Sequence, residues 1–196
     1  MIETNSEKNK TLAGVGLMSA IIVDLTIIAT FVKFGPFSIT LALVPIVVGS
    51  AIFGSAYGAL FGGVFGLVAL IMSIFGFDVG GSILWNVNPL MTEFVCLAKG
   101  AAAGFVSGLF YSIVSKKNMF VGIVGAAVIC PIVNTGVFVL FMVLFYHETL
   151  VEWAAGQDTL YYIVFGLVGV NFLLELIINI IFSPIIKRII NIKKVI

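Results

Sequence analysis

The sequence predicts an all-α fold, a bundle of six transmembrane helices with both termini in the cytoplasm. Hydrophobic residues make up 61% of the 196 positions and charged residues only 10%, whereas a soluble domain carries about 25% charged residues. Apolar runs also recur along the chain, and a helix needs about 20 apolar residues to cross the hydrocarbon core. We therefore expect a single transmembrane domain over residues 1–196, surrounded by the lipid bilayer. The net charge of +1 argues against a strongly basic nucleic-acid binder.

Six apolar segments form the predicted spans. The first follows a polar stretch; it is too long for the core of a secretion signal and no small-residue cleavage site follows it. The second is the shortest, and only a glycine-flanked turn at 53–58 separates it from the third. Five spans with a re-entrant piece is therefore the alternative. The predicted helices cover about 12–32, 40–55, 57–75, 90–115, 119–146 and 159–186.

The positive charges predict the orientation. With six spans, three basic groups fall on one side of the membrane and together hold eight of the ten Lys and Arg residues. Cytoplasmic loops carry the excess of Lys and Arg, so both termini are expected in the cytoplasm. Five spans would put the termini on different sides, which makes the charge pattern an independent argument for six. The three groups are Lys8 and Lys10, Lys116 and Lys117, and Lys187, Arg188, Lys193 and Lys194.

Small residues recur every four positions in the predicted spans. Such stripes let helix backbones approach closely in a membrane, where no hydrophobic force pulls helices together. We expect most of them to pack within the chain, with docking of a partner subunit as the alternative. The first span carries a shorter stripe, Gly16 and Ala20. The longer stripes are Gly54, Gly58, Gly62 and Gly66, and Gly100, Gly104 and Gly108.

Catalytic motifs are missing from the sequence. We find no Walker sequence, no Gly-x-Ser-x-Gly elbow and no His and Glu metal cluster. We therefore expect no enzyme, no cofactor and no metal site. Any energy for transport would come from a partner protein or an ion gradient.

Polar residues inside the predicted spans are the best candidates for function, because burying them in a membrane is costly. Lys99, Asn134 and Asn171 fall at similar depths, roughly 15 to 18 Å below the outer face at about 1.5 Å per residue. Glu175 lies one turn deeper than Asn171, and Asp24 lies slightly nearer the outside. One interpretation is a structural ion pair of Lys99 with Glu175 or Asp24. The other is an outward-opening cavity for a small polar solute.

A second polar group opens the fourth span. Asn88 is expected to cap this helix with Pro89 at its first position. Asn86, Thr92 and Glu93 then remain available to line the mouth of a pocket.

Three segments resemble the substrate-binding S components of energy-coupling factor (ECF) vitamin transporters. The resemblance covers nearly the whole chain, and two of the segments look most similar to pantothenate-type members. The segments are ITLALVPIVVGSAIFGSAYGALFGGVFG from Ile39 to Gly66, KGAAAGFVSGLFY from Lys99 to Tyr111, and CPIVNTGVF from Cys130 to Phe138.

This resemblance implies a multi-pass protein of the bacterial cell membrane that captures a vitamin from outside. It would deliver the vitamin by docking on a transmembrane coupling protein that carries two cytoplasmic ATPases. Family members often dock through Ala-x-x-x-Ala on the first helix, and the nearest match here is Gly16-x-x-x-Ala20. For pantothenate, Lys99 would meet the carboxylate, with Asn134, Asn171 and Asn86 as hydrogen-bonding groups.

Two alternatives stay open at this point. The ligand would equally be riboflavin, folate, pyridoxine or a pyrimidine, since asparagines and a lysine also suit these compounds. The chain would otherwise be a self-sufficient, ion-coupled secondary transporter, in which Asp24 or Glu175 carries the proton.

Overall fold

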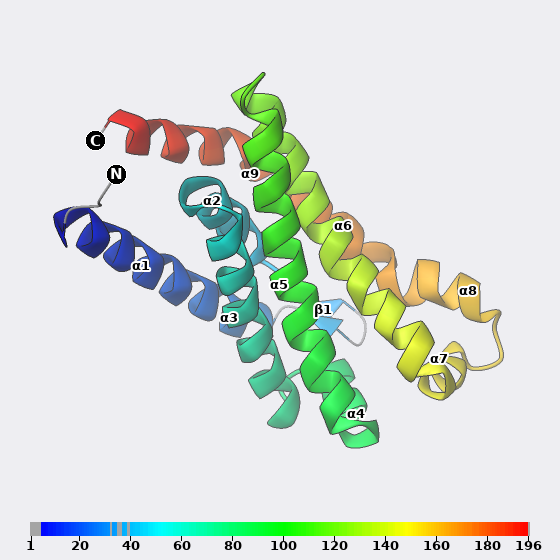
Figure 1. Cartoon of the computed structure of the whole chain (residues 1–196). Helices are drawn as coiled ribbons and strands as arrows, with labels where there is room; N and C mark the ends of the chain where they lie inside the picture. Colours follow the sequence, from blue (N-terminus) through cyan, green and yellow to red (C-terminus); the bar gives the residue numbers. More distant parts are fainter. Residues whose placement is uncertain (1–4, 32, 35–36, 39, 196) are drawn as a thin grey trace.

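The structure is a bundle of long helices with small elements in its connections (Figure 1). It is a computed structural model that describes residues 5–31, 33–34, 37–38 and 40–195. The helices are α1 (Asn5–Ala29), α2 (Leu43–Phe53), α3 (Ser55–Ile74), α4 (Val79–Val87), α5 (Pro89–Val114), α6 (Met119–Phe145), α7 (His147–Ala154), α8 (Thr159–Tyr161) and α9 (Val170–Val195), with the π-helix η1 (Tyr162–Gly169) between α8 and α9. The strands β1 (Lys33–Phe34) and β2 (Phe37–Ser38) pair antiparallel.

Five helices of the described residues are long and apolar enough to cross a membrane. Their surface is apolar as well: Leu12 and Leu160 are each 72% exposed, as expected for side chains that face lipid. The five are Glu7–Ala29, Ser55–Ile74, Pro89–Val114, Met119–Phe145 and Thr159–Asn191. The structure thus confirms the all-α membrane bundle, whereas the count of six spans and the orientation stay predictions.

Among the predicted spans, the second, 40–55, differs most in length from the helix that the structure shows. Helix α2 has 11 residues, about 16 Å at 1.5 Å per residue, which is too short to cross the hydrocarbon core alone. It ends at Gly54, whose φ of 100° allows the sharp turn into α3. Most of α2 is buried, so this helix lies inside the bundle.

Other predicted boundaries also shift. Helix α1 starts at Asn5, in the stretch expected to be polar and irregular, and ends at Ala29; the predicted end at residue 32 lies outside the described residues. The connections 76–89 and 147–158 contain α4 and α7. Asp78 caps α4 by accepting a hydrogen bond from the Gly81 N–H at 3.1 Å, and such a cap satisfies a backbone group that the helix leaves without a partner.

The long glycine stripes pack α3 against α5. A Cβ atom on Gly58, Gly62 or Gly66 would collide with the backbone carbonyl of Gly104, Gly100 or Cys96 respectively. The pairs run in opposite directions along the two helices, so α3 and α5 are antiparallel. Packing within the chain is therefore confirmed for these stripes. Side chains larger than hydrogen would hold the two backbones apart.

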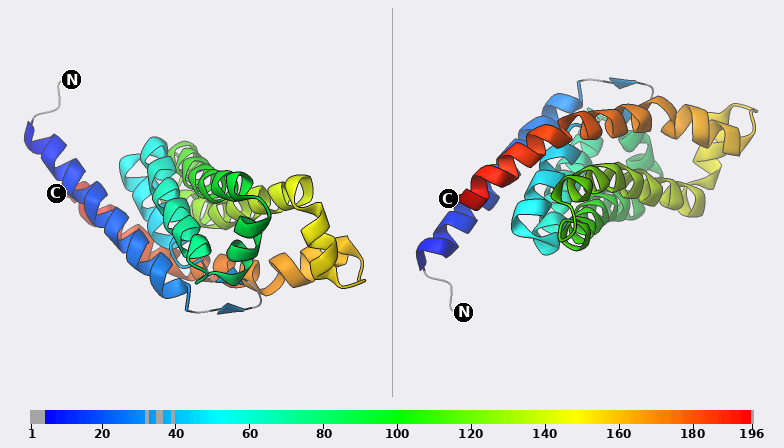
Figure 2. Two further views of the ribbon diagram at one scale, coloured as in Figure 1. Left: turned by 90° about the horizontal axis from the view of Figure 1, so that it is seen from below. Right: turned by 90° about the horizontal axis from the view of Figure 1, so that it is seen from above.

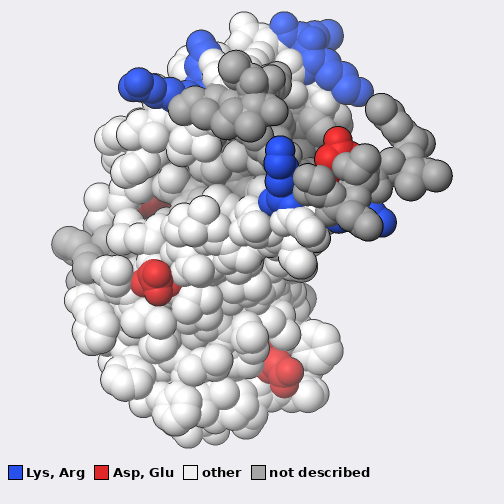
Figure 3. Space-filling view, turned by 90° about the vertical axis from the view of Figure 1, so that its left-hand side faces the viewer, with Lys and Arg blue, Asp and Glu red and all other residues white. Residues whose placement is uncertain are grey.

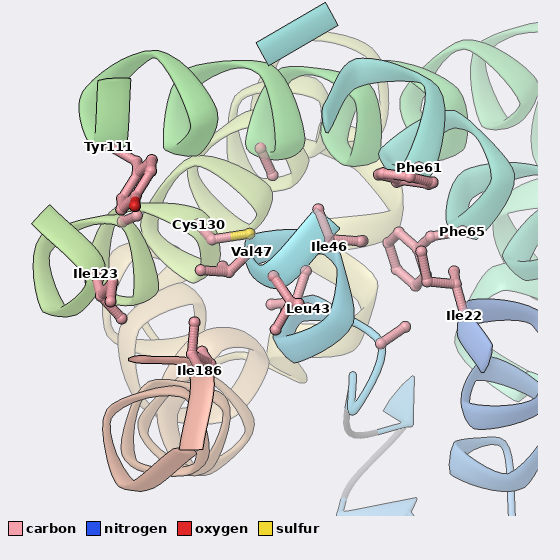
Figure 4. Close-up of a cluster of buried hydrophobic side chains, with 14 of the residues drawn as sticks. Ile22, Leu43, Ile46, Val47, Phe61, Phe65, Tyr111, Ile123, Cys130 and Ile186 are labelled. Atoms are coloured by element: carbon pink, nitrogen blue, oxygen red, sulfur yellow. The ribbon is translucent and has the colours of Figure 1, made fainter. Parts of the chain in front are cut away.

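The largest buried cluster surrounds α2 (Figure 4). Side chains from α1, α3, α5, α6 and α9 pack against it, so the short helix holds the longer ones together. The fully buried members include Ile22, Leu43, Ile46, Val47, Phe61, Ala103, Ile123, Ala126 and Cys130.

Positively charged side chains gather at the end of the molecule where both termini lie. Figure 3 shows Lys and Arg side chains gathered at the upper end of one face, the end where both termini lie in Figure 1. Lys187 of α9 lies over the Phe120 ring at the start of α6, 5.2 Å from its centroid. This contact places the basic residues of α9 beside the connection between α5 and α6.

Candidate functional site

A cavity of about 100 Å³ lies in the half of the bundle away from the termini. Its wall combines the end of α1, residues 40–42 before and at the start of α2, the second half of α3, and parts of α5, α6, η1 and α9. A single water needs only about 10–15 Å³ on such a measure. The cavity therefore has room for several waters or for part of a small organic molecule.

Lys99 of α5 lines this cavity between two aromatic rings. Its Nζ lies 5.8 Å from the centroid of Phe65 on α3 and 5.1 Å from that of Phe138 on α6. Ring faces attract cations at these distances. No carboxylate of the described residues forms an ion pair with this lysine, so the aromatic rings are the contacts that hold the ammonium in place.

Glu175 of α9 lines the same cavity and is 5% exposed. Its Oε1 accepts a hydrogen bond from the backbone N–H of Thr40 at 2.9 Å. This bond ties α9 to the segment that leads into α2. Neither Glu175 nor Asp24 pairs with Lys99 in the described part of the chain, and Asp24 is exposed on α1.

Two asparagines complete the polar wall. Asn134 of α6 is 5% exposed, and its Oδ1 has no hydrogen-bond partner in the described part of the chain. Asn171 lies near the start of α9, one turn before Glu175, and also lines the cavity. The structure therefore brings together Lys99, Asn134, Asn171 and Glu175, four of the seven residues expected to bind substrate.

The other three expected residues lie away from the cavity wall. Asn86 is exposed on α4, where its Nδ2 donates to the Ser82 carbonyl at 2.9 Å. Glu93 is exposed on α5. Thr92 is fully buried, and its Oγ1 lies 2.7 Å from the Tyr146 hydroxyl.

The hydroxyls of Thr92 and Tyr146 share a hydrogen-bond acceptor at the junction of α4 and α5. Thr92 and Tyr146 each donate to the carbonyl oxygen of Asn88, at 2.9 Å in both cases. The Asn88 side chain accepts from the Met91 N–H at 3.2 Å, and Pro89 is the first residue of α5. The predicted cap is thus confirmed, and Thr92 connects it to the end of α6.

Several lining residues were not expected from the sequence. Phe65 and Phe138 read as ordinary apolar residues of their spans, and only their contacts with Lys99 distinguish them. Thr26 lies on α1 and Thr30 directly follows its last residue, and their spacing of four residues is the sequence signal for a common polar face. The remaining unexpected polar members are Thr40, Asp78 and Thr135.

Within the described residues, no group of three or more His, Cys, Asp and Glu side chains is placed to hold a metal ion. The polar wall instead offers one ammonium, carboxylates, amides and hydroxyls. Such groups bind a small polar organic molecule through charge and hydrogen bonds.

The short stripe on α1 behaves differently from the longer ones. Gly16 and Ala20 are exposed, and a Cβ atom on Gly16 would meet nothing within 4 Å. By contrast, Gly14 faces the Phe53 ring of α2. The outer side of α1 therefore leaves Gly16 and Ala20 unpacked by the rest of the described chain.

Comparison with protein families places most of the chain in one family. The family model described as "ECF transporter, substrate-specific component" matches residues 10–187. No curated protein matches the chain.

Proposed function

Because the chain belongs to the family of ECF transporter substrate-specific components, we propose that it captures pantothenate for an ECF-type importer of the bacterial cell membrane. It would bind the vitamin from outside and would not hydrolyse ATP itself. The family match supports a substrate-binding transport subunit. That its substrate is pantothenate and its membrane bacterial is our proposal.

The observation that carries the proposal is the Lys99 ammonium, which faces a polar cavity without a carboxylate partner among the described residues. Lys99 is half-buried, and removing a cation even partly from water is costly unless an anion meets it. Pantothenate carries one carboxylate, an amide and two hydroxyls. Lys99 would bind the carboxylate, and Asn134 and Asn171 would form hydrogen bonds with the amide and hydroxyls.

We propose a membrane arrangement that fits this role. The chain would form one domain with six spans, in which α2 completes its crossing together with the segment before it. Both termini would be cytoplasmic, because the basic residues gather at the end where the termini lie. The cavity would then open toward the outside, where the vitamin is taken up.

The exposed Gly16 and Ala20 support a docking role for α1. Small residues let a second helix approach closely. The partner would be the transmembrane coupling protein, which carries two cytoplasmic ATPases and supplies the energy for release inward.

Binding of radiolabelled vitamins to the purified chain in detergent tests the proposal. We expect tight binding of pantothenate by the isolated chain, without ATP or partner subunits. Binding of riboflavin, folate, pyridoxine or a pyrimidine instead would keep the capture function and exclude pantothenate. If no compound binds and uptake in cells follows a proton gradient, the chain is a secondary transporter and the proposal is wrong.

A further inference from the structure

The two charged side chains that define the cavity come from opposite sides of the bundle. Lys99 belongs to α5 and Glu175 to α9, and Figure 2 shows these helices on different sides with α6 between them. Contacts of α6 with both helices agree with this arrangement. Lys99 and Glu175 therefore face one cavity from separate walls, and within the described residues no ion pair joins them.

The Lys99 wall can only donate hydrogen bonds. An ammonium group has three donors and no acceptor, and its contacts in the structure are the faces of the Phe65 and Phe138 rings. The attraction between a ring face and a cation is about 0.5–2 kcal/mol, which offsets only part of the free energy needed to remove the cation from water. The group that meets Lys99 must therefore be an acceptor, and an anion suits it best.

The Glu175 wall offers acceptors instead. An ionised carboxylate accepts at about four positions, and among the described residues only Thr40 reaches it, through its backbone N–H and its side chain. Asn134 adds a second acceptor, because its buried Oδ1 has no hydrogen-bond partner among the described residues. Leaving such buried acceptors without donors costs about 1–3 kcal/mol each.

Resting on the capture function proposed above, we propose that the cavity selects a two-ended solute. Its acceptor end is a single acid group that meets Lys99, and its donor end carries hydroxyl or N–H groups that meet Glu175 and Asn134. Glu175 is thus a determinant of specificity for the donor end, in addition to its bond with Thr40.

This polarity defines a class of substrate. A plain carboxylic acid leaves the acceptors of Glu175 and Asn134 unsatisfied, and a neutral alcohol leaves Lys99 without an anion. A second acid group at the far end would meet Glu175, and Asp78 also lines the cavity. Like charges at short range repel strongly in a site with little water.

Three matched compounds test the acid end and the donor end of the solute separately. Pantothenate has both, panthenol replaces its carboxylate with an alcohol, and N-(3,3-dimethylbutanoyl)-β-alanine keeps the carboxylate, the amide and the carbon skeleton but lacks both hydroxyls. Equilibrium binding of each would be measured with the unmodified chain, with Glu175→Gln and with Glu152→Gln. Gln retains a carbonyl oxygen for the Thr40 N–H, and Glu152 is an exposed carboxylate on α7 that controls for the substitution itself.

We expect the unmodified chain to bind pantothenate roughly tenfold or more tightly than either analogue, because each analogue loses a hydrogen bond to a charged group. Glu175→Gln should weaken the binding of pantothenate to the level of N-(3,3-dimethylbutanoyl)-β-alanine and leave the binding of that analogue unchanged. Such a loss of difference between two ligands identifies a direct interaction. Glu152→Gln should change none of the three affinities.

Other results would overturn the inference. Equal weakening of all three compounds by Glu175→Gln, with a lowered melting temperature, would assign Glu175 a purely structural role. Unchanged pantothenate binding in Glu175→Gln would exclude the donor-end contact. Binding of uncharged pyridoxine or riboflavin in place of pantothenate would contradict the inference that the solute needs an acid group. The capture function itself would still hold. Absence of binding by every vitamin would instead contradict the capture function on which the inference rests.

Discussion

At the residue scale, Lys99 differs in position and burial from the other basic side chains whose burial the structure describes. The remaining described Lys and Arg residues with assigned burial are exposed near the ends of helices, whereas Lys99 lies near the middle of α5 between two rings. Membrane proteins rarely place a cation there unless it pairs with a protein group or a ligand. Glu175 and Asp78 line the same cavity, but no described carboxylate forms an ion pair with Lys99, and we therefore propose a ligand anion as its partner.

Replacing Lys99 with Met tests this, because Met is unbranched like Lys, fills most of the same space and carries no charge. We expect pantothenate affinity to fall by at least about 2 kcal/mol, because the ligand carboxylate would then be buried without its cation. That corresponds to roughly 30-fold in Kd, measured by equilibrium binding to the purified chain. Lys116→Met, in the connection after α5, is the matched control and should bind normally. Unchanged affinity of Lys99→Met would rule out the carboxylate contact.

At the element scale, the α3–α5 contact depends on glycine at particular positions. Gly62 and Gly63 are neighbours on α3, yet only Gly62 faces α5. A Cβ atom on Gly62 would collide with the Gly100 carbonyl, whereas one on Gly63 would meet nothing within 4 Å. The pair therefore separates tight packing from the effect of glycine on the helix itself.

Gly62→Ala should destabilise the protein by about 1–3 kcal/mol, because the helices must move apart or strain to admit the methyl group. Gly63→Ala should be neutral or stabilising, since alanine favours a helix over glycine by up to about 1 kcal/mol. Thermal unfolding in detergent would measure both. Equal midpoints for the two variants would show that α3 and α5 do not pack as closely as the structure has them.

At the scale of the whole molecule, the proposed binding site and the proposed docking surface lie on different parts of the chain. The cavity lies inside the bundle, whereas Gly16 and Ala20 lie on the outer side of α1. A change on that outer side should leave the isolated chain able to bind vitamin. It should still prevent delivery, if α1 docks on the coupling protein.

Gly16→Leu tests this separation against Gly136→Leu. Both glycines are exposed and helical, and a Cβ atom on either would meet nothing within 4 Å. We expect Gly16→Leu to abolish pantothenate uptake by cells that contain the coupling module, with binding to the purified chain retained. Gly136→Leu, on α6, should retain both. Normal uptake by Gly16→Leu would exclude this face as the docking surface.

The sequence by itself determined the helical membrane bundle, because long apolar runs and few charges allow no other backbone arrangement in lipid. It also indicated two polar residues of the cavity wall, since Lys99 and Glu175 stand out in apolar surroundings. It could not predict that α2 would be a short helix buried by its neighbours. Periodicity cannot separate a buried helix from a spanning one when its length is marginal.

Only the tertiary structure decided which polar groups meet. Depth along each predicted span correctly grouped Lys99, Asn134, Asn171 and Glu175. It could not show that Thr92, one position before Glu93, would turn inward to Tyr146, a residue 54 positions away. The direction in which a side chain points depends on how its helix is rotated against its neighbours. That rotation is set by the packing of contacts such as Gly62 against Gly100, which joins residues far apart in the chain.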